Sequence, residues 1–221
     1  IAPEQPAVWR TATSVALAAG DGPTAEEAAV QRLRLSGDGV DGLMDLALAA
    51  FFALDLPTAR SAAAEAMQVS PDDEAARYWR EKLDAIASEQ ELLVEVGRAH
   101  CRRGRYAQGL ELFDRALDLG DSFDARLYAG RALLVLGDAE AASGQFHAAL
   151  AITPGDTEAL AGLGMAAQMA EALEGASAAA APAPAVQDPP PAAPRPAFCW
   201  QCGNSLIGDA AFCVACGAKV E

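Results

Sequence analysis

The sequence has few of the residues on which many enzymes and membrane proteins depend. It holds only two histidines, aromatic residues make up 6% of it, and 16 Lys and Arg stand against 31 Asp and Glu. No apolar run approaches the roughly 20 residues that span a membrane. No glycine-rich phosphate loop and no Ser, His and Asp set can be recognised. We therefore expect a protein that is not an enzyme and has no membrane span.

The shortage of basic residues also bears on partners. With a formal net charge of -15, the chain would be repelled by phosphate backbones, so nucleic acid is a disfavoured partner. The N-terminal residues show no basic segment followed by an apolar one, so a signal peptide is not visible. The chain begins with Ile1 rather than Met, so other residues can precede it. We expect a cytoplasmic protein.

Alanine is very abundant, and it contributes to the 52% of residues that are hydrophobic. It is the best helix former, and its small side chain lets helices approach closely. Runs of Val, Ile and Thr that would suggest strands are scarce. The composition therefore predicts an all-α body built of many short helices.

The middle of the chain repeats itself with a period of about 33 residues. Small residues, one aromatic residue and a terminal Asp or Pro recur in the same order. Gly97, His100, Gly104, Gly109, Phe113, Ala116 and Asp121 are followed by Gly130, Leu133, Gly137, Ala142, Phe146, Ala149 and Pro154. This spacing predicts a helix, a short turn at a glycine, a second helix and a break. An ordinary alanine-rich bundle with accidental self-similarity is the alternative.

The pattern resembles the tetratricopeptide repeat, a family of 34-residue helix pairs that stack into a superhelix. Residues 123–156 fill the family's preferred positions with Gly130, Ala142, Phe146, Ala149 and Pro154. Residues 89–122 match with Asp121 in place of the proline, and residues 40–73 match with Ala63 in place of the aromatic residue. The resemblance implies a stack of helical hairpins whose first helices line a concave groove for protein segments.

The other helical segments fit this pattern less well. Residues 1–39 are interpreted as a degenerate helical pair, and whether they form a true repeat is left open. Residues 74–88 are predicted to form an extra helix, with Tyr78, Trp79, Leu83 and Ile86 at helical spacing. We expect residues 157–176 to form a helix that caps the array.

Sixteen of the 21 residues in the segment 177–197 are Ala or Pro. Proline cannot donate to a helix or a sheet, and the segment offers no large apolar side chains to bury. We therefore expect a disordered, extended linker with polyproline II character. A proline-rich ligand at residues 191–194 is the alternative.

Two CxxCG turns lie within the last 23 residues and supply Cys199, Cys202, Cys213 and Cys216. Two such turns can close a tetrahedral shell of four thiolates around a zinc ion, and a shell without an open position indicates a structural metal. A redox CxxC pair and an iron site are alternatives. Disulfides are another, and they would leave Cys101 unpaired.

The cysteine-rich segment, residues 198–221, resembles the short bacterial zinc ribbon family. The resemblance implies a small β-hairpin module that holds one structural zinc ion. Because so short a module buries little apolar surface, the metal would supply most of its folding free energy, roughly 10 kcal/mol.

Three arginines are the candidate partner-binding residues. If first helices line the groove, Arg98 and Arg131 occupy equivalent places in consecutive first helices, and Arg102 lies one turn beyond Arg98. Together they could hold a carboxylate or an acidic peptide. The alternative is that they only form ion pairs with nearby acids such as Glu95 and Asp124.

Other candidate residues are better explained by packing. His100 is expected to pack inside a helix pair, and His147 to lie at the surface. Cys101 has no CxxC partner and is interpreted as a small buried residue.

The function that we expect is a non-enzymatic adaptor. Its repeats would bind a protein segment, and the tethered zinc ribbon would contact a second partner. The alternative is a nucleic-acid or transcription-associated factor whose ribbon touches nucleic acid, which steep salt dependence of binding would reveal. The sequence does not determine the oligomeric state.

Overall fold

Short polar side chains begin most of the helices. At these N-caps a side-chain oxygen accepts a hydrogen bond from the backbone N–H three residues later, which satisfies a group that the helix leaves unpaired. The caps of this kind are Asp21, Asp55, Asp73, Ser88, Ser122, Asp138 and Asp156. The helix starts are therefore fixed by local sequence.

The structure is a computed structural model that describes residues 5–37 and 39–179, and these form ten α-helices and no strand. The helices are α1 (Pro6–Ala19), α2 (Gly22–Ser36), α3 (Val40–Phe52), α4 (Leu56–Val69), α5 (Glu74–Ala85), α6 (Glu89–Arg102), α7 (Tyr106–Leu119), α8 (Phe123–Leu136), α9 (Ala139–Ile152) and α10 (Thr157–Ala179). The predicted all-α fold is confirmed for this part of the chain. None of these described helices is long and apolar enough to cross a membrane.

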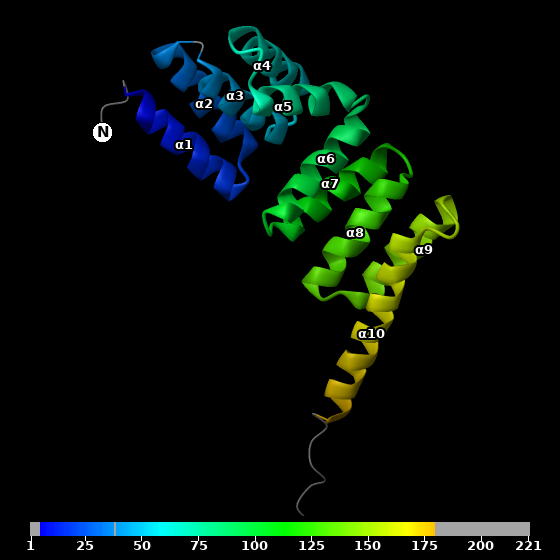
Figure 1. Ribbon diagram of the computed structural model, residues 1–221. Helices are drawn as coiled ribbons and strands as arrows, with labels where there is room; N and C mark the ends of the chain where they lie inside the picture. Colours follow the sequence, from blue (N-terminus) through cyan, green and yellow to red (C-terminus); the bar gives the residue numbers. More distant parts are fainter. Residues whose placement is uncertain (1–4, 38, 180–221) are drawn as a thin grey trace, which may run out of the picture. The chain divides into compact units, whose positions relative to one another are not determined.

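Most helices pair with the next one along the chain. Helices α1 and α2, α3 and α4, α6 and α7, and α8 and α9 lie side by side as hairpins, whereas α5 is a single helix between two pairs (Figure 1). The chain divides into two units, residues 1–177 and 178–221. The hairpins all belong to the first unit.

Helix α10 is longer than the sequence predicts. It continues to Ala179, so residues 177–179, which we assigned to the linker, are helical. Ala178 and Ala179 are strong helix formers, and the first proline follows only at Pro182, so the helix has no reason to end at Ser177. Residues 180–221, including the predicted zinc ribbon, lie outside the described residues.

The core of the first unit is a series of local clusters. Phe51 is fully buried among α3, α4, α5 and α6, Phe113 among α6, α7 and α8, and Phe146 among α8, α9 and α10. Each cluster joins one helix pair to the next element. This arrangement is typical of repeat proteins, in which each unit contacts only its neighbours.

A glycine in the first helix of a pair faces a phenylalanine in the second. A Cβ atom built on Gly97 in α6 would lie 2.6 Å from Cε1 of Phe113 in α7. The next pair repeats the contact, because a Cβ on Gly130 would lie 2.8 Å from Cε1 of Phe146. Any larger residue would push the two helices apart. The 33-residue period therefore corresponds to a repeated helix-to-helix contact.

Long-range hydrogen bonds from Arg105 and Gln108 tie the first pair to the third. Arg105, in the turn between α6 and α7, donates hydrogen bonds from Nη1 to the carbonyl oxygens of Leu17 and Ala18, the latter at 2.7 Å. These carbonyls lie at the C-terminal end of α1, where a cation is favoured.

Two glycine substitutions should have opposite effects. Gly97→Ala should lower the free energy of unfolding by about 1–3 kcal/mol, because the new methyl group meets the buried ring of Phe113. Gly144→Ala should raise it by up to about 1 kcal/mol, because Gly144 is an exposed residue inside α9 with no atom within 4 Å of its Cβ position. Urea unfolding followed by circular dichroism measures both, and a neutral or stabilising Gly97→Ala would contradict the contact.

Candidate functional site: two charged pockets on the first helices

Helices α5, α6 and α8 together carry two pockets, and we call their shared surface the first-helix face. Both pockets draw residues from α6 and α8. One of them also draws on α5, and the other is also lined by Tyr106 and Phe113 of α7. The two pockets differ in charge, and the sequence predicted only one of them.

The arginine pocket lies between α6 and α8 and has a volume of about 400 Å³. All three arginines singled out from the sequence line it, although they come from two helices and are separated by up to 33 residues. Its lining includes Arg98, Arg102, Tyr106, Tyr128, Arg131 and Val135. Phe113 also lines it, so the pocket combines three guanidinium groups with three aromatic rings.

The ring of Tyr128 organises two of these arginines. The Arg98 guanidinium carbon lies 4.4 Å from the ring centroid, and that of Arg131 lies 5.5 Å from it. The ring of Phe113 stacks against Tyr128 at a centroid distance of 6.2 Å. Gly97 lies against the buried ring of Phe113, and that ring in turn positions Tyr128. Tyr128 then positions the guanidinium groups of Arg98 and Arg131 through cation–π contacts.

The three arginines differ in their acidic partners. Arg98 pairs with Glu95 one turn earlier, as the alternative interpretation expected, but not with Asp124. Arg131 pairs with Glu158 of α10 at 2.8 Å. Within the described residues, Arg102 makes no hydrogen bond or ion pair, and its side chain is exposed. Arg102 is therefore the cation most available to a partner.

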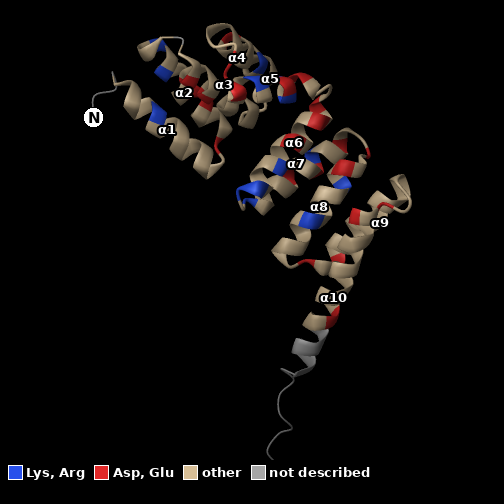
Figure 2. Cartoon of the chain, in the orientation of Figure 1, with Lys and Arg blue, Asp and Glu red and all other residues tan. Residues whose placement is uncertain are grey.

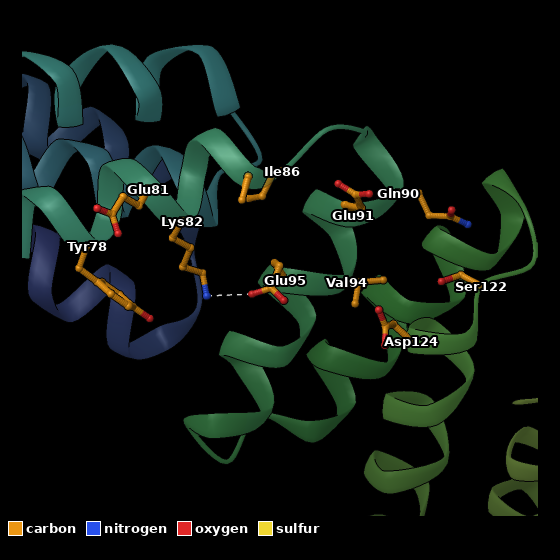
Figure 3. Close-up of a pocket in the computed structure, with 11 residues that line it drawn as sticks. Tyr78, Glu81, Lys82, Ile86, Gln90, Glu91, Val94, Glu95, Ser122 and Asp124 are labelled. Carbon is orange, nitrogen blue, oxygen red and sulfur yellow. Dashed lines mark ion pairs between the residues drawn. The ribbon is translucent and has the colours of Figure 1, made fainter. Parts of the chain in front are cut away.

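The acidic pocket, about 490 Å³ in volume, was not predicted from the sequence (Figure 3). It lies where the C-terminal half of α5 meets the N-terminal halves of α6 and α8. Glu81, Glu91, Glu95 and Asp124 contribute four carboxylates against the single ammonium group of Lys82, and Tyr78, Ile86 and Val94 supply apolar surface. The side chains of Glu81 and Asp124 have no hydrogen bond or ion pair among the described residues.

Glu95 stands at the boundary between the two pockets. Its carboxylate pairs with Lys82 Nζ at 2.8 Å and with the Arg98 guanidinium. Burial favours the neutral form of Glu95, but the hydrogen bond and charge of Lys82, together with those of Arg98, outweigh it, so its pKa lies below the ordinary value. Glu95 therefore stays ionised and holds one cation from each pocket.

The sign of the charged side chains changes along the axis of α6. Acidic residues, together with basic residues of α5, lie where α5 meets α6, and basic residues gather at the turn between α6 and α7 (Figure 2). The first-helix face thus changes sign from the N-terminal to the C-terminal end of α6.

The two histidines lie as expected. His100 is only 4% exposed, and its Nδ1 accepts a hydrogen bond from Arg105 Nε at 3.1 Å. His147 is exposed on α9.

Cys101 departs from its prediction. It is only partly buried and lines the arginine pocket, and its sulfur atom packs against Gly109 of α7, where a Cβ atom would clash with it. Burial nevertheless raises the pKa of its thiol, while Arg102 lowers it. The thiol is therefore poorly suited to act as a nucleophile.

No group of three or more His, Cys, Asp or Glu side chains that could hold a metal occurs in residues 5–37 and 39–179. The predicted zinc ligands, Cys199, Cys202, Cys213 and Cys216, lie outside these residues.

Comparison with known families assigns two parts of the chain. The tetratricopeptide repeat family matches residues 88–152, which span α6 to α9. Residues 88–152 are tetratricopeptide repeats. The zinc-ribbon domain matches residues 198–220, which contain all four cysteines. Tetratricopeptide repeats indicate a protein-interaction scaffold and are typical of non-enzymatic proteins, and the ribbon match indicates zinc binding.

Solved structures similar to this chain include the crystal structure of MamA protein, at 16% identity and a TM-score of 0.38, covering 78% of this chain and 86% of that one. Another is the APC/C hetero-tetramer Cut9-Hcn1, at 18% identity and a TM-score of 0.35, covering 70% of this chain and 28% of that one. The comparison with curated proteins found no match.

The buried histidine of the repeats should make stability depend on pH. Burial lowers the pKa of His100 below its ordinary value of 6.5, and the charges of Arg105 and Arg103 act in the same direction, whereas the interaction with the side chain of Gln108 opposes them. The folded protein therefore keeps His100 neutral at a pH where the unfolded chain already binds a proton. The stabilising effect is complete above about pH 6.5 and is lost as the pH falls toward the folded-state pKa.

Replacing His100 by leucine, the residue at the equivalent position of the next repeat, should reduce this pH dependence. The difference in free energy of unfolding between about pH 7.5 and about pH 5.5 should be smaller in His100→Leu than in the wild type. His147→Gln is the control and should keep the wild-type difference. An equal difference in all three proteins would show that His100 does not stay neutral on folding.

Proposed function

We propose that the chain is an adaptor whose first-helix face binds a segment of a partner protein. The arginine pocket receives a carboxylate of that segment, and the zinc ribbon contacts a second partner. The observation that carries this proposal is the convergence of Arg98, Arg102 and Arg131 on one pocket, with Arg102 lacking an acidic partner within the described part of the chain.

Charge supports a protein partner over nucleic acid. The three arginines lie in a chain whose net charge is -15, so a long phosphate backbone would meet repulsion beyond the pocket. A single carboxylate requires only the local cations. Charge-assisted hydrogen bonds from guanidinium to carboxylate contribute about 1.5–3 kcal/mol each.

Reversing the charge of Arg102 tests the pocket with the least disturbance to the fold, because no ion pair of the described residues is broken. Arg102→Glu should reduce capture of the partner at least about ten-fold, since one charge-assisted hydrogen bond is lost and repulsion is added. Affinity purification from the native cell with quantitative mass spectrometry measures it.

Arg115→Glu is the matched control, because Arg115 is exposed on α7, outside both pockets, and the change in net charge is the same. It should leave capture unchanged. A partner lost equally from both variants, or from neither, would contradict the arginine pocket.

For the ribbon we propose one structural zinc ion held by Cys199, Cys202, Cys213 and Cys216. The family match at residues 198–220 and the two CxxCG turns support this ligand set. Four thiolates fill a tetrahedral shell, which suits a structural rather than a catalytic role.

Elemental analysis of purified protein should find about one zinc per chain. Cys199→Ser should lose most of the metal and make the ribbon sensitive to protease, because the metal supplies its folding free energy. Cys101→Ser should retain all of the metal, since Cys101 lies in α6. Iron in place of zinc, or full zinc content in Cys199→Ser, would overturn this assignment.

A further inference from the structure

Two acidic residues of the acidic pocket recur with the same 33-residue period as the arginines. Glu91 in α6 and Asp124 in α8 both line it and are 33 residues apart, as are Arg98 and Arg131 in the arginine pocket. Each first helix of the tetratricopeptide repeats therefore presents an acid and, seven residues later, an arginine. Helices α6 and α8 run in the same direction because α7 reverses the chain between them, so the two acids share one end of the face and the two arginines the other.

The charge stripe on α6 is continuous. Glu91, Glu95, Arg98 and Arg102 follow one another at intervals of three or four residues, which places them on one side of the helix. The ion-paired set of Lys82, Glu95 and Arg98 lies between the two pockets and is internally satisfied. Among the described residues, the side chains of Glu81 and Asp124 on one side and Arg102 on the other have no partner. Glu91 accepts a hydrogen bond from the backbone N–H of Ala87 through Oε2 at 2.6 Å and has its other carboxylate oxygen left for a ligand.

Helix dipoles alone do not explain this pattern. An acid near the N-terminus and a base near the C-terminus each stabilise a helix by about 0.3–1 kcal/mol. However, Glu81 lies in the C-terminal half of α5, where the dipole disfavours a carboxylate, and still faces the same pocket. The acids therefore converge on a cavity from helix ends of both polarities.

The lining of the acidic pocket suits a long cationic side chain. Ile86 and Val94 line the pocket with the little apolar surface that they expose, 4% and 6%, against which an aliphatic stem can pack. Tyr78, which is 60% exposed, offers an aromatic face to a cation. Figure 3 places Glu81 on the α5 side of the pocket, and Glu91 and Asp124 on the side formed by α6 and α8. A lysine or an arginine fulfils all of these requirements, whereas an acidic or purely apolar side chain does not.

Building on the proposed function, we infer that the acidic pocket is a second subsite, which takes a Lys or Arg side chain of the same partner segment whose carboxylate enters the arginine pocket. Glu91 and Arg98 are seven residues apart, or about 10 Å along the helix, and Glu91 and Arg102 are about 16 Å apart. An extended segment covers these distances in about three to five residues. The partner segment therefore carries a basic residue and an acidic residue three to five positions apart.

A random dodecapeptide library displayed on phage and selected against the full chain tests this inference. Peptides with a Lys or Arg three to five positions from an Asp or Glu should be enriched at least about five-fold over the unselected library. The double variant Glu91→Gln, Asp124→Asn should lose the basic preference and keep the acidic one. Arg102→Gln should do the reverse, and Arg115→Gln should behave as the wild type.

The outcomes separate this inference from the proposed function. Selection of peptides with an acidic residue only, lost in Arg102→Gln and unaffected by the double variant, would overturn the second subsite and leave the arginine pocket in place. Enriched peptides with no charge preference, or no enrichment at all, would overturn both. Circular dichroism of each variant confirms that a changed preference does not come from unfolding.

Discussion

The contact on which the rest of the structure depends is the one between a first-helix glycine and a second-helix phenylalanine. Because Gly97 and Gly130 have no Cβ, the rings of Phe113 and Phe146 lie directly against the first helices. This contact fixes the rotation of each first helix about its axis. Arg98 and Arg131 are the residues that directly follow the two glycines, so both are turned away from the second helix by the same amount and reach the same face.

The electrostatics of that face follow from the same constraint. The acids six residues before each glycine and the arginines one residue after it stay in register from α6 to α8, which keeps charges of opposite sign at opposite ends. Lys82 and Glu95 then separate the two ends with an ion pair whose members are both mostly buried. Arg98 and Arg131 pair with Glu95 and Glu158 of the same chain. The pocket of this acidic chain stays cationic because Arg102 adds a third guanidinium group that has no acidic partner within the described residues.

The helix pairs and the arginine pocket could be predicted from the sequence, because both depend on the 33-residue repeat. The recurrence of Gly97 and Phe113 at Gly130 and Phe146 predicted the helix pairs, and the same offset predicted that Arg98 and Arg131 would share a face. The acidic pocket could not be predicted, because Tyr78 and Glu81 come from α5, a single helix whose place relative to the repeats no period fixes. The bond from Arg105 to the end of α1 also escaped prediction, since 87 or 88 residues separate its partners. The sequence predicts too early an end for α10, because Ala178 and Ala179 are compatible with a helix as well as with a linker.

We propose above all that the first-helix face, and not the exposed outer side of the second helices, contacts the partner. Site-specific photo-crosslinking in the native cell tests it directly, with a photoreactive residue in place of Tyr78 in the acidic pocket, Val135 in the arginine pocket, or Leu119 on α7, all of which are exposed. Tyr78 and Val135 should crosslink to the same protein, and Leu119 should not. Crosslinks from Leu119 alone, or to unrelated proteins from the two pockets, would contradict it.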